Sequence, residues 1–133
     1  MPEVGEHLAQ ARHNEEVVLY LGRVSPDYVD WQMTVLFYAA LHYVDAYFAA
    51  GQLGGATVSL LPRNLHPRNH AERDQLVSRH LPAVQRAYRL LKDHSIDARY
   101  QIGGFTPRDI IDARDMDLAD IRREVGRRLG ILL

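Results

Sequence analysis

The chain has 133 residues, 47% of them hydrophobic and 25% charged, as expected for one soluble globular domain over residues 1–133. It has no cysteine, which excludes disulfides and thiolate chemistry. Its formal net charge of −1 does not favour tight non-specific binding to nucleic acid. The polar start and the short apolar runs are unlike a signal peptide or a membrane span, so we expect a cytoplasmic protein with no membrane contact.

The first half of the chain predicts two long helices. Residues 3–23 carry a partial apolar stripe with steps of three and four residues. Ser25, Pro26 and Asp27 form a strong start signal for a second helix that runs to about Ala50. This helix is apolar on nearly all sides from Met33 onward. It is therefore expected to be central in the fold, or to be covered in part by a second subunit.

A loop with several Gly and Pro residues follows, and a third helix is expected to begin near His70 with Asn69 as its N-cap. Its apolar period continues to Leu91, so Pro82 is expected to kink the helix or divide it into two segments. The last helix opens with a capping-box pattern at residues 106–109 and ends near Gly130. Its expected buried positions are Ile110, Ala113, Leu118, Ile121, Val125 and Leu129.

No segment shows the alternation typical of a strand. The pattern predicts an all-α fold, an antiparallel bundle of four to five helices with the Gly/Pro-containing loop between the second and third helices.

The segment from Leu65 to His80 carries three of the seven histidines and three of the fifteen arginines. At 100° per residue, His70, Arg73 and His80 project from the same side as the apolar stripe, whereas Arg79 points to solvent. A cation on such a stripe is costly unless it is paired or lines a cleft. Two interpretations stay open: a buried ion pair, or a functional cleft in which a histidine and an arginine act on a phosphate.

Three polar residues interrupt the second helix. Tyr38, His42 and Asp45 lie at i, i+4 and i+7 and therefore share one face. They form either a satisfied network in the core or a support for the cationic site.

The landmarks along the chain are Asn14, Trp31, the run LFYAALHYVDAYFA, the HAERD segment, and Tyr88 with the SIDARY segment. Together they resemble the HEPN superfamily of small all-helical domains. Many members are metal-independent ribonucleases whose signature is an arginine, often followed by Asn, Asp or His, and a histidine after four to six intervening residues. They commonly work as dimers with the motif facing across the interface. Bacterial examples often act as toxins or in phage defence, and other members have lost activity.

Two windows fit the signature, Arg73 to His80 and Arg63 to His70, each with six intervening residues. We prefer Arg73 and His80, because seven residues along a helix return to the same face within about 20°. In metal-independent RNA cleavage the 2′-hydroxyl is the nucleophile, a histidine transfers protons, and an arginine binds the phosphate oxygens. His70 is a candidate second titrating group. The residues assigned to substrate binding or support are Arg63, His42, Tyr38, Arg79 and Arg99.

The resemblance implies a metal-independent endoribonuclease of toxin or phage-defence type, with a catalytically inactive module that binds a partner protein or nucleotide as the alternative. The expected partners are a second copy of the chain, joined through the apolar second helix and the site-bearing helix, RNA, and an antitoxin or other protein. No cofactor or metal is expected. His66 and His70 have the i, i+4 spacing of metal ligands, but Pro67 between them argues against a helix. The GQLGG run lacks the Lys and Ser/Thr of a phosphate-binding loop.

Overall fold

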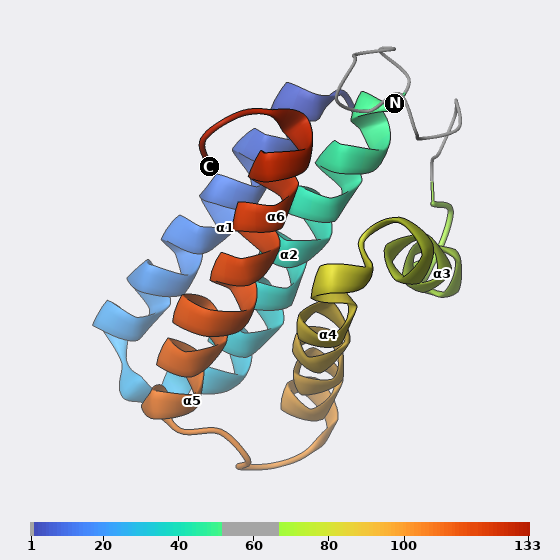
Figure 1. Cartoon of the computed structure of the whole chain (residues 1–133). Helices are drawn as coiled ribbons and strands as arrows, with labels where there is room; N and C mark the ends of the chain where they lie inside the picture. The colour runs from blue at the N-terminus through green and yellow to red at the C-terminus, as the bar shows by residue number, and fades with distance from the viewer. Residues whose placement is uncertain (1, 52–66) are drawn as a thin grey trace.

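The computed structural model describes residues 2–51 and 67–133, and all regular elements among them are helices (Figure 1). The predicted all-α bundle is therefore confirmed for this part of the chain. Residues 52–66, which make up most of the predicted Gly/Pro loop, lie outside the described residues.

The first two helices form an antiparallel hairpin (Figure 1). Helix α1 covers Val4–Val24 and helix α2 covers Val29–Ala50, with a short 3-10 turn, η1 (Pro26–Tyr28), between them. The Ser25 hydroxyl accepts a hydrogen bond from the Asp27 amide at 3.1 Å. The predicted start signal thus acts one turn before α2 itself.

Helix α2 is the centre of the bundle. Of its 22 residues, 16 are buried, and α1, α4 and α6 pack against it. The largest fully buried side chains include Tyr43, Phe37 and Phe48 of this helix. The prediction of a central helix is confirmed. Because the chain's own helices cover these apolar residues, they give no evidence for a dimer, and the dimer stays a prediction.

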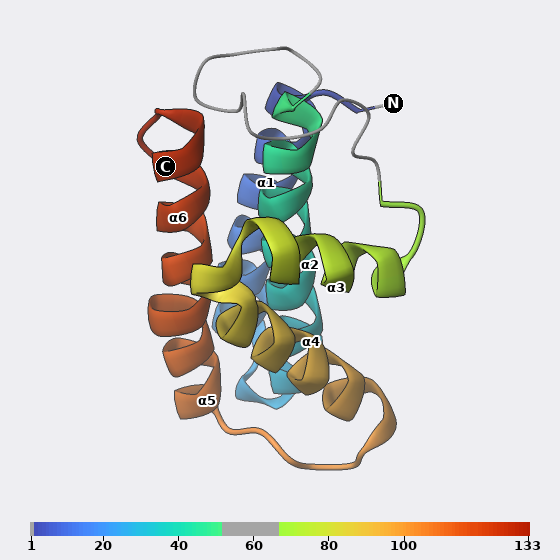
Figure 2. The ribbon, with the colours of Figure 1, turned by 45° about the vertical axis from the view of Figure 1, so that its right-hand side comes forward.

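Helix α3 (His70–His80) lies across the long axis of α2 (Figures 1 and 2). The Asn69 side chain accepts from the Glu72 amide at 2.8 Å, which confirms the predicted N-cap. The Glu72 carboxylate does not complete a capping box; it pairs with Arg68 at 3.4 Å.

Pro82 divides the predicted third helix into two. Leu81 leaves the helical region (φ −128°, ψ 52°), and a 3-10 turn, η3 (Pro82–Val84), leads into α4 (Gln85–Tyr100). The two helices have different axes (Figure 2). The predicted division of the third helix at Pro82 is therefore confirmed, and the apolar period before and after it belongs to two separate axes.

The last helix contains a π-helical turn. Helix α5 covers Pro107–Asp112, the π-helical segment η4 covers Ala113–Leu118, and α6 covers Ala119–Leu129. Thr106 and Asp109 form the predicted capping box, and Gly130 ends α6 with a left-handed backbone (φ 72°). The buried Ala113 and Leu118 are five positions apart, which in a regular α-helix would place them about 140° from each other around the axis. The wider turn of a π-helix brings both onto one side.

Candidate functional site

The first turns of α3 meet α2 through an ion pair between Arg73 and Asp45. The Arg73 Nε donates to Asp45 Oδ1 at 2.8 Å, and Nη2 donates to Oδ2 at 3.1 Å. Only 12% of the arginine side chain and 11% of the aspartate side chain are exposed. Two parallel hydrogen bonds of this kind fix the plane of the guanidinium. The interpretation of Arg73 as part of a buried ion pair is confirmed. The support of a functional cationic site by Asp45 stays a prediction.

His42 lies one helical turn before Asp45 and contacts α1. Its Nδ1 is 3.2 Å from Nδ1 of His7, and the ring centroids are 5.5 Å apart. Burial lowers the pKa of His42, and positive charge on His7 and on Arg73 lowers it further, against an opposing effect of Asp45. His42 is therefore largely neutral at neutral pH, since the ordinary pKa is already 6.5.

His70, the first residue of α3, is exposed and lies with its ring 5.9 Å from the Phe37 ring. Partial desolvation of its ring is the largest cause that lowers its pKa. The positive charges of Arg73, Lys92 and Arg99 lower the pKa further, and Asp74 opposes them. Arg73 thus acts on two histidines that come from different helices. We call His7, His42, Asp45, His70 and Arg73 the histidine–arginine cluster.

His80 lies at the other end of α3, apart from this cluster. Burial lowers its pKa, and so do the charges of Arg79 and Arg128, whereas Arg73 has no part in the shift. Arg73 and His80 are separated by about 10 Å along the helix axis, at 1.5 Å per residue. The joint action of Arg73 and His80 on one phosphate stays a prediction. The structure groups Arg73 with His70 and His42 instead.

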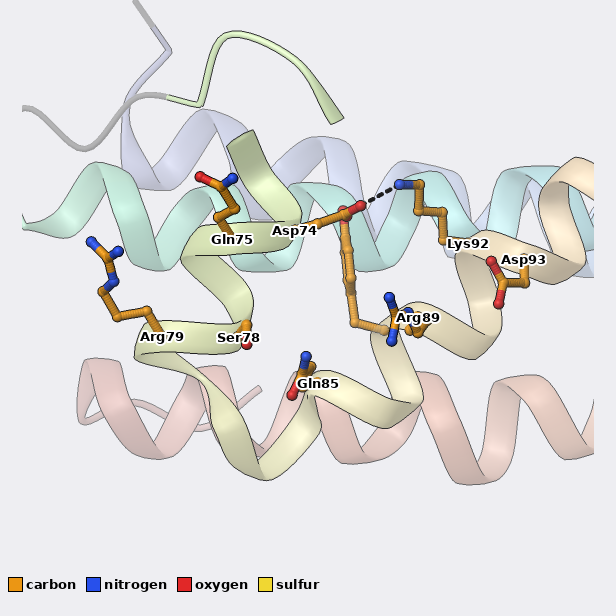
Figure 3. A pocket seen from close by; sticks show the side chains of 9 residues that line it. Asp74, Gln75, Ser78, Arg79, Gln85, Arg89, Lys92 and Asp93 are labelled. Carbon is orange, nitrogen blue, oxygen red and sulfur yellow. Dashed lines mark hydrogen bonds and ion pairs between the residues drawn. The ribbon is translucent and has the colours of Figure 1, made fainter. Parts of the chain in front are cut away.

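The remaining predicted residues have varied surroundings. Tyr38 is half-buried against the core, and its ring centroid is 5.5 Å from that of Phe37. Arg79 is exposed as predicted, and Figure 3 shows its side chain pointing away from α4. The Arg99 Nε donates to the Ser95 carbonyl at 3.1 Å, and its guanidinium lies 5.8 Å from the centre of the Tyr100 ring.

Two of the predicted candidates, Arg63 and His66, lie outside the described residues. Among residues 2–51 and 67–133, no group of three or more metal-ligating side chains is placed to hold an ion. This finding does not apply to the i, i+4 pair of His66 and His70, because His66 lies outside the described residues.

A cleft of about 670 Å³ between α3 and α4 was not predicted from the sequence (Figure 3). An ion pair of Lys92 with Asp74 lies at one end of it. The buried Asp74 Oδ1 and Tyr88 hydroxyl have no hydrogen-bond partner among the described residues. Polar residues recur at steps of three and four on both helices, a pattern that indicates a polar face on each. The sequence does not show that these two faces lie opposite each other, because that depends on the tertiary fold. The residues that line the cleft are Asp74, Gln75, Ser78, Arg79, Gln85, Tyr88, Arg89, Lys92 and Asp93.

Comparison of the chain with known protein families, characterised proteins and solved structures gives no match. The HEPN resemblance therefore stays a prediction that rests on the sequence landmarks. In the described part of the chain, no helix has the length and apolar composition needed to span a membrane.

Proposed function

We propose that the chain is a metal-independent endoribonuclease whose chemistry takes place at the histidine–arginine cluster. The observation that carries the proposal is the ion pair of Arg73 with Asp45, which joins α3 to α2 one helical turn from His70 on α3 and one turn from His42 on α2. Both imidazoles have a lowered pKa, so each has a substantial neutral fraction near neutral pH. A neutral imidazole can act as the base, an imidazolium as the acid and a guanidinium as the phosphate ligand in RNA cleavage without metal. The toxin or phage-defence role follows from the HEPN resemblance alone.

The reaction has a defined proton balance. One imidazole accepts the proton of the 2′-hydroxyl, and the oxygen forms a bond with phosphorus. The bond from phosphorus to the 5′-oxygen breaks, and the second histidine, protonated, donates its proton to the leaving oxygen. The products are a 2′,3′-cyclic phosphate and a 5′-hydroxyl.

Arg73 retains donors for the phosphate. Asp45 accepts from its Nε and Nη2, and no described residue accepts a hydrogen bond from Nη1. Because the pair with Asp45 is net neutral, Arg73 supplies directed hydrogen bonds more than net charge. The charges of Lys92 and Arg99, which also act on His70, provide the positive potential for the phosphate.

The test is cleavage of a mixed RNA pool in EDTA by the wild type and by single variants. We expect His42→Gln and His70→Gln each to lower the rate by about 100-fold or more, the usual contribution of an acid or base. His13→Gln, a change of an exposed histidine on α1, is the matched control and should cleave normally. Loss of cleavage in His80→Gln but in neither cluster variant would move the site to the other end of α3.

The pH dependence is a second readout of the same site. With both histidines titrating below the ordinary value of 6.5, the maximum of kcat/KM is expected on the acid side of pH 6.5. The rate falls at lower pH as the base becomes protonated, and at higher pH as the acid loses its proton. A maximum well above neutral pH would contradict the assignment.

The alternative is an inactive module that binds a partner protein or nucleotide, and one observation favours it. Asp45 holds Arg73 through both carboxylate oxygens in a largely buried position. Drawing the arginine toward a phosphate leaves that carboxylate buried without its partner, which is costly. Absence of cleavage by the folded wild type, at acid as well as neutral pH, would favour this function.

A further inference from the structure

Two exposed aromatic side chains line a slot between the start of α2 and the end of α4. Trp31 is 57% exposed and Tyr100 is 79% exposed. The slot has a volume of about 320 Å³, and its other lining residues are Asp30, Thr34, Ala98 and Arg99. Large aromatic groups left open to solvent around a concave site are typical of a binding surface.

Tyr100 stands between this slot and a second hollow. The second hollow, of about 330 Å³, continues to Ile102 and Phe105, and the lining residues that it shares with the slot are Asp30, Ala98, Arg99 and Tyr100. A ligand longer than one planar group therefore has room on both sides of the tyrosine.

The chemistry of the slot fits a nucleobase. Trp31 and Tyr100 offer ring faces, on which bases of single-stranded nucleic acids stack. The guanidinium of Arg99 over the Tyr100 ring offers a further planar cation for stacking or for a phosphate. Asp30 in the slot and Asp27 in the second hollow offset the charge of Arg99, so stacking has to supply most of the affinity.

The slot is connected with the histidine–arginine cluster. At 100° per residue, Trp31, Tyr38 and His42 lie on one face of α2 within about 40°. Trp31 and His42 are about 16 Å apart along the helix axis. The charge of Arg99 acts on His70, which joins the two regions from the side of α4.

We propose, as an extension of the proposed function, that this slot holds an unpaired base of the RNA strand, stacked between Trp31 and Tyr100. Given the separation of 16 Å, the base belongs to a nucleotide other than the two that flank the cleaved bond. Because the slot contains no group that transfers a proton to the scissile phosphate, its role is to bind and position the strand.

The only tryptophan of the chain is Trp31, so its fluorescence reports on the slot directly. The titrant is a short single-stranded 2′-O-methyl RNA of mixed sequence, which cannot be cleaved because its nucleophile is blocked. We expect quenching of Trp31 that saturates, about ten-fold weaker binding for Tyr100→Ala, and near-normal binding for Tyr100→Phe. Tyr20→Ala, a change of an exposed tyrosine on α1 that lines neither hollow, is the control and should bind as the wild type does.

The salt dependence and a mononucleotide separate the sources of binding. With Arg99 as the cation at the slot, the slope of log Kd against log salt should be close to one or lower. Adenosine monophosphate should quench more weakly than the oligonucleotide, because it occupies one hollow. A steep salt dependence with no effect of Tyr100→Ala would place the strand elsewhere and overturn the proposal.

Two further outcomes distinguish this proposal from the proposed function. Quenching without cleavage of ordinary RNA keeps the slot and rejects the ribonuclease. Cleavage that Tyr100→Ala leaves unchanged, with no quenching, keeps the ribonuclease and rejects the slot. A third outcome is a wild type whose fluorescence RNA does not quench, together with a smaller sedimentation mass for Trp31→Ala or Tyr100→Ala. This outcome would show that the surface joins two copies of the chain and would also reject the slot.

Discussion

Arg73 has two roles, as the ion-pair partner of Asp45 and as a positive charge near two histidines. Its guanidinium is held by two hydrogen bonds to Asp45, and its charge still contributes to the lowered pKa of His42 and His70 after burial, the largest cause, has acted. Burial and the fixed cation both lower the pKa of the two imidazoles, which favours the neutral form of each without excluding the protonated form. The ion pair and the histidines are therefore one electrostatic unit, and changing either partner should change the titration of the other.

Removing one side of the ion pair should be costly. Asp45→Ala leaves Arg73 largely buried without a partner, and we expect the free energy of unfolding to fall by about 3 kcal/mol. A double change, Asp45→Leu with Arg73→Met, fills the space with apolar groups and should recover most of the loss. Urea unfolding of the single and double variants measures both values. Asp45→Leu and Arg73→Met are therefore also made singly, and a loss in the double variant equal to the sum of these two losses would show that the side chains do not interact.

The histidines predict how stability depends on pH. The pKa of His42 in the folded state lies below the ordinary 6.5, so the unfolded chain binds a proton at a higher pH than the folded chain does. The free energy of unfolding therefore falls as the pH drops through the region below 6.5. In urea unfolding at several pH values, His42→Gln should reduce this slope. His70 and His80 act in the same direction, so part of the slope remains.

The matching control is His13→Gln. Its side chain is exposed on α1, so the slope of unfolding free energy against pH should equal that of the wild type. An unchanged slope in His42→Gln would mean that burial and the charges near His42 do not lower its pKa in the folded state.

The helical elements differ in how far the sequence determines them. Local signals were sufficient for the caps, because a cap such as Asn69 or Thr106 depends on neighbours within three residues. The break at Pro82 was expected, but the direction of α4 after it depends on packing against α2. The π-helical turn was present in the sequence as a five-residue step from Ala113 to Leu118, which a search for steps of three and four overlooks.

The π-helical turn makes an unusual deletion tolerable. Removing Met116, which is 62% exposed, shortens the step from Ala113 to Leu118 to four residues and permits a regular α-helix with the same buried stripe. We expect the variant to fold with a free energy of unfolding within about 1 kcal/mol of the wild type. Circular dichroism and urea unfolding provide the measurement.

Removing Arg123 instead is the matched deletion from regular helix. It is exposed as well, but its loss turns the end of α6 by about 100° and brings Gly126 to the buried position of Val125. This variant should lose several kcal/mol through the missing core side chain. Equal stability of the two deletion variants would contradict the assigned role of the π-helical turn.

Across the whole molecule, one carboxylate joins the first and last helices to the centre. Glu15 of α1 accepts a hydrogen bond from the Tyr43 hydroxyl of α2 and another from Arg122 Nη1 of α6, the latter at 2.5 Å. Tyr43 is only 1% exposed, so its hydroxyl has no alternative partner in water. Burial raises the pKa of Tyr43, and the contact with Glu15 raises it further.

Glu15→Ala should lower the free energy of unfolding by about 2 kcal/mol, since it leaves the Tyr43 hydroxyl buried and unsatisfied. Thermal unfolding followed by circular dichroism measures the change. Glu16→Ala, its exposed neighbour, should change stability by less than about 0.5 kcal/mol. Adding Tyr43→Phe to Glu15→Ala should restore part of the loss, because it removes the unsatisfied hydroxyl and keeps the ring. A further large loss would show that the hydroxyl is stabilised by a group other than Glu15.

The fold could be predicted from the sequence more completely than the candidate site could. Helical period and caps gave an all-α bundle with a central second helix, because both are read along the chain. Asp45 was predicted as a possible support for the cationic site but not as the ion-pair partner of Arg73, and His7 was not considered. These contacts join residues that are 28 and 35 positions apart in the chain. The apolar composition of α2 is the same whether helices of the same chain or a second subunit cover it. Only the tertiary structure shows that α1, α4 and α6 pack against it.

Two adjacent residues of α3 with opposite charges form ion pairs with two different helices. Arg73 pairs with Asp45 of α2, and Asp74 pairs with Lys92 of α4. The helix buries only two side chains, Leu76 and Val77, so the two ion pairs contribute to the choice of its rotation about its axis. A helix turned to exchange the two flanks would bring Arg73 to Lys92 and Asp74 to Asp45, like charges in both places. The order of Arg73 and Asp74 in the sequence thus favours the observed orientation of α3. This contribution to structural specificity is separate from the stability that either ion pair supplies.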